Sequence, residues 1–156
     1  MGLGLRLGLD RLPKGLGAPV GACLAGSAEL IEEAWRWKQM LGGAMRQSGV
    51  LAAAGLYALD NNVDRLADDH NRARRLVEGL AEIPGIQIEP AKVETNIVIF
   101  EVPDAEVFVR ALESKGVRMG ALDARRVRAV THLDLDDAGI DQALEAARAT
   151  VPAGVS

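Results

Sequence analysis

A lysine set in glycine-rich backbone is the residue of this chain best suited to covalent chemistry. Lys14 lies in the Pro-Lys-Gly-Leu-Gly stretch over 13–17, ahead of a short apolar run at 22–26. Removing such an amine from water favours its neutral form, which attacks a carbonyl to make a Schiff base. The glycines alone leave two interpretations open, because a solvated lysine in a turn would have the same neighbours.

Arginines at two further places could bind anions. Arg46 follows Gly42 and Gly43 near an expected helix start, where free backbone N–H groups and a guanidinium together suit a phosphate. Arg126 and Arg128 share one face of an expected strand, and a planar guanidinium suits two-bond recognition of a carboxylate. Purely structural roles at a helix start and on a solvated strand face would explain the same residues.

The histidines, the cysteine and a pair of aspartates are predicted to be structural. His70 falls on the apolar stripe of its helix, which predicts a buried histidine, and His132 is expected to hydrogen-bond near a strand end. Cys23, between Ala and Leu, is expected to be a buried, inert thiol. The aspartates at 68–69 are predicted to lie on a solvated helix face. No set of His, Cys, Asp or Glu here predicts a metal site.

Composition limits the class of protein and its partners. The 156 residues allow one sizeable domain, or a small domain with a helical segment. With 49% hydrophobic but only 3% aromatic residues, the core is expected to consist of Ala, Leu, Val and Ile. A net charge of −4 without a basic stripe argues against nucleic-acid binding, and no apolar run approaches the roughly 20 residues that cross a bilayer. A single cysteine suits a reducing cytoplasm.

Helical periodicity dominates the middle of the chain. Ser27 can cap a helix over 28–41, which Gly42 and Gly43 would end. Residues 46–59 are apolar on almost every side, which predicts a helix buried inside a domain or between subunits. An amphipathic helix is expected over 63–81.

The last third changes to a mixture of strands and helices. Strands are expected at 86–89, 95–102, 117–122 and 126–132, and helices at 104–115 and from 136 or 137 to 151. This order predicts an α+β domain in which helices cover one face of a mostly antiparallel sheet. The predicted divisions of the chain are 1–26, 27–83, 84–151 and a tail at 152–156.

Three segments resemble the low-specificity threonine aldolases, which use pyridoxal 5'-phosphate (PLP). They are the lysine segment, the stretch Met-Leu-Gly-Gly-Ala-Met-Arg-Gln-Ser-Gly-Val-Leu from position 40, and Arg-Ala-Val-Thr-His-Leu-Asp over 128–134. The resemblance covers nearly the whole chain, about 14–151. It implies the C-terminal portion of a PLP enzyme of fold type I, in which residues 1–26 are a remnant of the cofactor-binding domain and 84–151 the small domain.

The resemblance also implies roles for individual residues. Lys14 would be the Schiff-base lysine, Arg46 would lie near the cofactor phosphate, and Arg128 would hold the substrate carboxylate, with Arg126 as the weaker candidate. The implied reaction is a carbon–carbon lyase reaction on a β-hydroxy-α-amino acid: L-threonine or L-allo-threonine gives glycine and acetaldehyde. A homo-oligomer is implied as well.

Two other functions stay open at this point. One is a non-catalytic, folded or dimerising fragment, because in the resembled family a large cofactor-binding region precedes the lysine. For the same reason we expect no aldolase activity from these 156 residues alone. The other is β-elimination by a related PLP enzyme, since the motifs around the lysine are similar in both.

Overall fold

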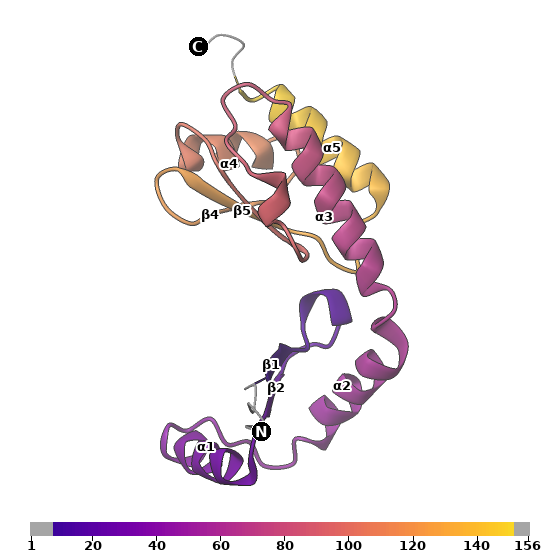
Figure 1. The fold of residues 1–156 in the computed structure, drawn as a ribbon, viewed down its shortest axis with the longest axis vertical. Coiled ribbons are helices and arrows are strands. Elements are labelled where there is room, and N and C mark those ends of the chain that lie inside the picture. Colours follow the sequence, from indigo (N-terminus) through magenta and orange to yellow (C-terminus); the bar gives the residue numbers. More distant parts are fainter. Residues whose placement is uncertain (1–7, 152–156) are drawn as a thin grey trace, which may run out of the picture. The chain divides into compact units, whose positions relative to one another are not determined.

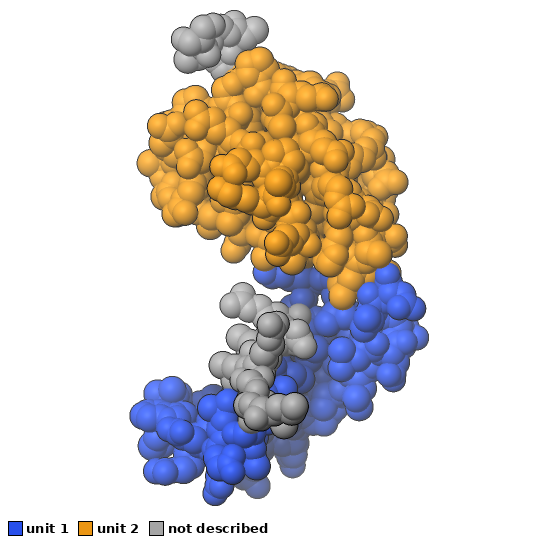
Figure 2. All heavy atoms as spheres, viewed as in Figure 1, with its two compact units in different colours: residues 1–64 blue, residues 65–156 orange. Residues whose placement is uncertain are grey.

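The computed structural model describes the backbone of residues 8–151 and the side chains of residues 12–151. Contacts between residues divide the chain into two compact units, 1–64 and 65–156 (Figure 2). The sequence predicts divisions at other positions, after residues 26 and 83, and these remain a prediction. Of the leucine-rich start, residues 8–11 form a strand, whereas 1–7 lie outside the described residues, as does the predicted tail.

The first unit consists of a hairpin and two helices. Its elements are β1 (Gly8–Arg11), η1 (Lys14–Leu16), β2 (Ala22–Ala25), α1 (Ala28–Met40) and α2 (Gly49–Asn62) (Figure 1). The two strands pair antiparallel. Helix α1 begins as predicted, because the Ser27 hydroxyl oxygen accepts a hydrogen bond from the Leu30 N–H at 3.3 Å.

Burial in the first unit is much lower than the sequence predicts. Most of α2 is exposed, including 82% of Val50 and 66% of Tyr57, because the described part of this unit packs little more than Leu12 and its neighbours against it. Burial of this helix inside a domain is therefore wrong, while burial between subunits stays a prediction. Cys23 is also exposed, contrary to expectation, because its hairpin has only two strands and all of β2 is exposed.

The second unit is an α+β domain, as predicted. Its elements are α3 (Leu66–Ala81), η2 (Pro90–Lys92), β3 (Ile97–Glu101), α4 (Ala105–Glu113), β4 (Gly120–Ala121), β5 (Arg126–Val130) and α5 (Asp137–Arg148). The strands form an antiparallel sheet in the order β3-β5-β4, so β5 is central. Helices cover one face of this sheet (Figure 1).

Alternation along the strands explains how the two faces differ. On the covered face, Val98, Phe100 and Val127 are at most 1% exposed and join the core residues of α3, α4 and α5. On the other face, Ile99 and Arg128 are exposed and lie opposite each other in the register. This period of two is the one expected for a sheet with a single buried face.

Caps and turns set the limits of the elements. The Asp104 and Asp136 carboxylates each accept a hydrogen bond from a first-turn N–H at 2.9 Å. The strand predicted over 117–122 shortens to β4, because the Val117 N–H still bonds the Leu112 carbonyl that ends α4. The strand predicted over 86–89 is reduced to one bridge from Gln87, since Pro90 has no N–H and begins η2.

Candidate functional site

Lys14 lies in a tight loop between β1 and β2. Its φ is +78°, a left-handed conformation that non-glycine residues rarely adopt. The loop is closed by its own backbone. The Gly17 N–H donates to the Lys14 carbonyl at 2.9 Å, and the Ala18 N–H donates to the Leu12 carbonyl at 3.2 Å. The Lys14 side chain is exposed, so the described residues do not provide the partial desolvation that the sequence suggests. The loop presents the amine outward from a fixed backbone.

Helix α2 supports this lysine loop. The Asn62 side-chain amide donates to the Leu16 carbonyl at 2.7 Å. Buried Leu12 packs with Ala18 and Ala58, and a Cβ at Gly55 would come within 3.0 Å of the Leu12 side chain. These contacts fix the position of the loop on the helix, which is what a residue that binds a cofactor covalently requires.

Arg46 lies in the short connection before α2. Its side chain is exposed and has no hydrogen bond or ion pair with any described residue. The residue before the helix, Ser48, makes no side-chain cap, so the first N–H groups of α2 are not capped by that hydroxyl. An exposed guanidinium beside an uncapped helix start is a combination that suits a phosphate.

The two arginines of β5 differ in their partners. The Arg126 Nε donates to an Asp123 carboxylate oxygen at 2.6 Å, and the same carboxylate accepts from the Arg126 main-chain N–H at 2.8 Å. The Arg125 main-chain N–H also donates to this carboxylate. The hydrogen bonds from the main-chain N–H groups of Arg126 and then Arg125 lower the pKa of Asp123 to about 2, and the Arg126 guanidinium contributes to this shift. Arg128, in contrast, has no hydrogen bond or ion pair with any described residue. Of the two arginines of β5, Arg128 is therefore the one whose guanidinium has no partner among the described residues.

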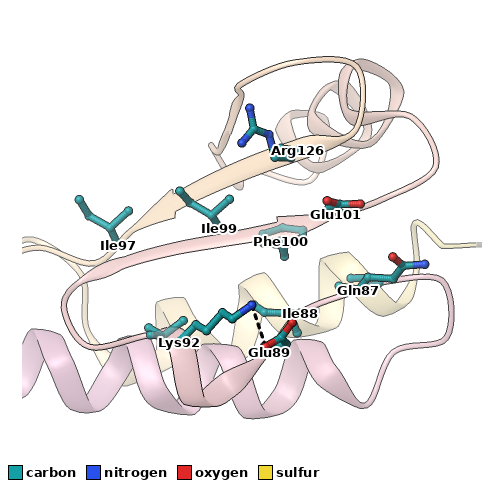
Figure 3. Close-up of a pocket in the computed structure, with 11 residues that line it drawn as sticks. Gln87, Ile88, Glu89, Lys92, Ile97, Ile99, Phe100, Glu101 and Arg126 are labelled. Carbon is teal, nitrogen blue, oxygen red and sulfur yellow. Dashed lines mark ion pairs between the residues drawn. The ribbon is translucent and has the colours of Figure 1, made fainter.

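An open groove lies along the outer edge of β3. It has a volume of about 800 Å³ and is lined by the segment from Ile86 to Val93, by β3 and by Arg126 (Figure 3). An ion pair of 2.9 Å between Lys92 and Glu89 lies on one side of it. Arg128 does not line this groove, so the groove and the candidate carboxylate ligand are separate features.

A buried aspartate is the polar residue that sequence reasoning missed. Asp69 is 0% exposed, although it was predicted on a solvated helix face, and His70, predicted to be buried, is only half-buried. The Asp69 carboxylate accepts hydrogen bonds of 2.6 and 3.3 Å from Arg65, one turn earlier. The i,i+4 spacing of Arg65 and Asp69 was the available signal, because a buried carboxylate needs such a partner. His132 accepts a hydrogen bond from the Asp134 N–H at 3.3 Å, the structural role predicted for it.

The described residues contain neither a cluster of metal ligands nor a membrane-spanning helix. Among residues 12–151, no three His, Cys, Asp or Glu side chains cluster as a metal site would require. In the same part of the chain no helix is long and apolar enough to cross a membrane.

Comparison with known proteins identifies the family. Residues 11–103, which include Lys14 and Arg46, match the model of the beta-eliminating lyases. The chain belongs to this family of PLP-dependent enzymes, which includes the threonine aldolases. It is 43% identical over 139 residues to the probable low-specificity L-threonine aldolase 2 of Arabidopsis thaliana, and 43% identical over 126 residues to the low specificity L-threonine aldolase of Escherichia coli K12.

These alignments cover 85% and 80% of this chain but 39% and 36% of the two relatives. The chain therefore spans little more than a third of the length of these relatives. Among solved structures, a putative aromatic amino acid beta-eliminating lyase/threonine aldolase from Exiguobacterium matches with a TM-score of 0.66. That match has 21% identity and covers 92% of this chain and 44% of the other. It supports the fold, which is that of part of a fold type I PLP enzyme.

The donor groups of the chain fit PLP group by group. An aldehyde requires an amine, and Lys14 presents one, exposed, on a loop held by Gly17 and Asn62. A phosphate requires a cation and free N–H groups, which Arg46 and the start of α2 offer. A substrate carboxylate requires a guanidinium without another partner, and among the described residues Arg128 meets this condition while Arg126 does not.

Proposed function

We propose that this chain supplies the lysine and arginine ligands of a PLP-dependent carbon–carbon lyase that cleaves L-threonine or L-allo-threonine to glycine and acetaldehyde. The observation that carries the proposal is the family match over 11–103, which includes a lysine held at φ +78° in a closed loop. The aldolase names of the relatives at 43% identity favour this reaction within the family.

Each residue has a distinct task in this proposal. PLP supplies an aldehyde that reacts with amines and a ring that takes up the electron pair of the broken Cα–Cβ bond. Lys14 would hold the cofactor covalently through its amine. Arg46 binds the phosphate. Arg128 binds the substrate carboxylate through two parallel hydrogen bonds, which restricts rotation about Cα and so orients the bond that breaks.

Cofactor attachment is tested directly on the chain. The purified protein is mixed with PLP, reduced with borohydride and digested, and the peptides are mapped by mass spectrometry. We expect the pyridoxyl group on Lys14, no labelling in Lys14→Ala, and unchanged labelling in the control Lys38→Ala. Lys38 is also exposed but lies on α1, outside the glycine loop. A pyridoxyl group on Lys38, Lys92 or Lys115 with Lys14 unmodified would contradict the proposal.

The reaction is tested in a chimera with the Escherichia coli aldolase. The segment of that enzyme that aligns with this chain is replaced by the residues of this chain, and glycine release from L-threonine is measured. We expect activity that disappears with Lys14→Ala. A folded, PLP-loaded chimera without activity would contradict the proposed aldolase reaction.

A related reaction is the second candidate. The family model and the Exiguobacterium structure both carry beta-eliminating lyase in their descriptions. β-Elimination from an aromatic amino acid such as tyrosine expels the aromatic group as phenol, and hydrolysis of the remainder gives pyruvate and ammonia, whereas aldol cleavage of threonine gives glycine and acetaldehyde. Measuring both sets of products from the same chimera distinguishes the two reactions.

We also propose that the chain forms a homo-oligomer through helix α2. The exposed apolar residues Val50, Leu56 and Tyr57 support this, since such a surface tends to be covered by another subunit. Analytical ultracentrifugation should show a dimer or larger species, and Leu56→Glu should reduce it. A monomer at all concentrations would rule this proposal out. If the chain also failed to bind PLP, the alternative of a non-catalytic folded module would be favoured.

We propose a cytoplasmic location, which its single cysteine supports because it cannot form an internal disulfide. Fractionation that found the protein exported or in membranes would contradict this.

A further inference from the structure

A buried hydrogen-bond cluster joins the end of β5 to the start of α3. Thr131, directly after the strand, is 1% exposed, and its hydroxyl donates to the Asp69 main-chain carbonyl at 2.7 Å. Its N–H donates to the Asn96 carbonyl at 3.0 Å, and the Asn96 side-chain amide donates to the Thr131 carbonyl at 2.6 Å. Every polar group of Thr131 is thus engaged, and we call these three residues the Thr131 cluster.

The helix side of the Thr131 cluster is itself fixed. The Asp69 carboxylate is held by Arg65 at 2.6 Å and lies 4.0 Å from Arg72. The Asp69 side chain therefore secures the first turns of α3, while its carbonyl receives the hydroxyl that secures the strand. Because the strand end bonds to a rigid helix start, the end of β5 has little freedom to shift along α3.

The strand that ends in this cluster carries Arg128, three residues earlier. Arg128 lies opposite Ile99 on one side and Gly120 on the other, and its guanidinium has no partner among the described residues. Its place in the sheet is therefore set by the β5 backbone and its pairing with β3 and β4, without a contact from the guanidinium. At its other end, β5 is fixed by the Asp123 turn, where the carboxylate binds the Arg125 and Arg126 N–H groups.

We propose that Thr131 is a positioning residue, whose hydroxyl holds the β5 backbone at Arg128 in the register that a carboxylate ligand requires. The contribution of Thr131 to catalysis rests on the proposed function of Arg128. The restraint that its hydroxyl places on β5 does not depend on that function. A β-branched residue at this position would suit a strand without any hydroxyl, so valine is the decisive replacement. It keeps the shape of threonine and removes the hydroxyl, with its bond to the Asp69 carbonyl and its longer contact of 3.5 Å with the Asn96 carbonyl.

The experiment measures backbone amide hydrogen exchange by NMR in the full chain. Thr131→Val should speed exchange of the protected amides from Arg128 to Thr131 by about tenfold beyond any change in global unfolding. Thr131→Ser, which retains the hydroxyl, should restore rates to within about threefold of the wild type. Thr150→Val is the matched control: it removes a similar hydroxyl-to-carbonyl bond of 2.8 Å, from Thr150 to Ala146 at the end of α5. It should leave the β5 amides unchanged.

Equal acceleration in Thr131→Val and Thr150→Val, or failure of Thr131→Ser to restore protection, would overturn the proposal. If Thr131→Val does not fold, the wild-type Thr131 hydroxyl proton decides. We expect it to exchange slowly enough to be observed by NMR, and a rapidly exchanging proton would overturn the proposal. Failure of the proposed role of Arg128 is a separate result, seen as unchanged threonine cleavage by the chimera carrying Arg128→Lys, and does not alter these exchange rates. Failure of the proposed function is seen as an inactive, PLP-loaded chimera.

Discussion

Replacing Asp69 with alanine should lower the free energy of unfolding of the second unit by about 3 kcal/mol. The Asp69 side chain is fully buried and accepts two hydrogen bonds from the Arg65 guanidinium, which is 18% exposed. Breaking a buried ion pair from one side costs about 3–5 kcal/mol, because the remaining charge loses its partner. The partial exposure of Arg65 lets water recover part of this loss, which places the expected value at the lower end.

Urea unfolding followed by circular dichroism measures this difference, and the chain contains its own control. Asp68 is the preceding residue on the same helix but is exposed, so Asp68→Ala should change the free energy of unfolding by less than about 0.5 kcal/mol. Asp69→Asn keeps an acceptor but removes the charge and should fall between the two. Equal effects of Asp68→Ala and Asp69→Ala would refute the argument that burial and the Arg65 pair determine the cost.

Three further predictions concern the candidate site. In the chimeric aldolase, Arg128→Lys should lower kcat/KM by about 10- to 100-fold, because an ammonium cannot form the two-bond fork. The control Arg126→Lys should change kcat/KM less than about threefold. Equal losses in the two variants would make Arg126 a candidate carboxylate ligand again. The pKa of Asp123, lowered to about 2 from 3.8, predicts a stabilising contribution that is complete above pH 3.8 and is lost as the pH falls toward 2. Asp123→Asn should flatten this part of a plot of stability against pH, and an unchanged plot would contradict the assignment. Lys14→Gly and Lys14→Ala should both abolish PLP attachment, but the glycine variant should be more stable to urea by about 1 kcal/mol, because only glycine adopts a φ of +78° without strain.

The sequence predicted the elements of the second unit well because their signals are local. Asp104 and Asp136 cap their helices through bonds to N–H groups only three residues away. Alternation placed Arg126 and Arg128 on one face of their strand, and the structure leaves both exposed and buries Val127 between them, because successive side chains of a strand point to opposite sides. The fold class follows from such short-range rules, which need no knowledge of distant contacts.

Burial of polar residues depends on distant partners, so sequence patterns predict it less well. Asp69 and His70 are neighbours on one helix, and hydropathy alone favours burying the histidine. The structure buries Asp69, whose carbonyl also meets Thr131, 62 residues further along the chain. The sequence likewise predicted an apolar helix over 46–59, which the structure has as α2, but its pattern carries no information about which surface covers that helix.

The candidate ligands show why residue type and face are insufficient to assign a site. Arg126 and Arg128 have the same side chain and lie on the same face of β5, so alternation cannot rank them. A turn residue, Asp123, engages one of them and leaves the other without a partner among the described residues. At Lys14 the distinguishing feature is a backbone angle that disfavours every residue except glycine. A lysine lies here where glycine would fit better, and that mismatch, more than the surrounding glycines, makes Lys14 the residue to test first.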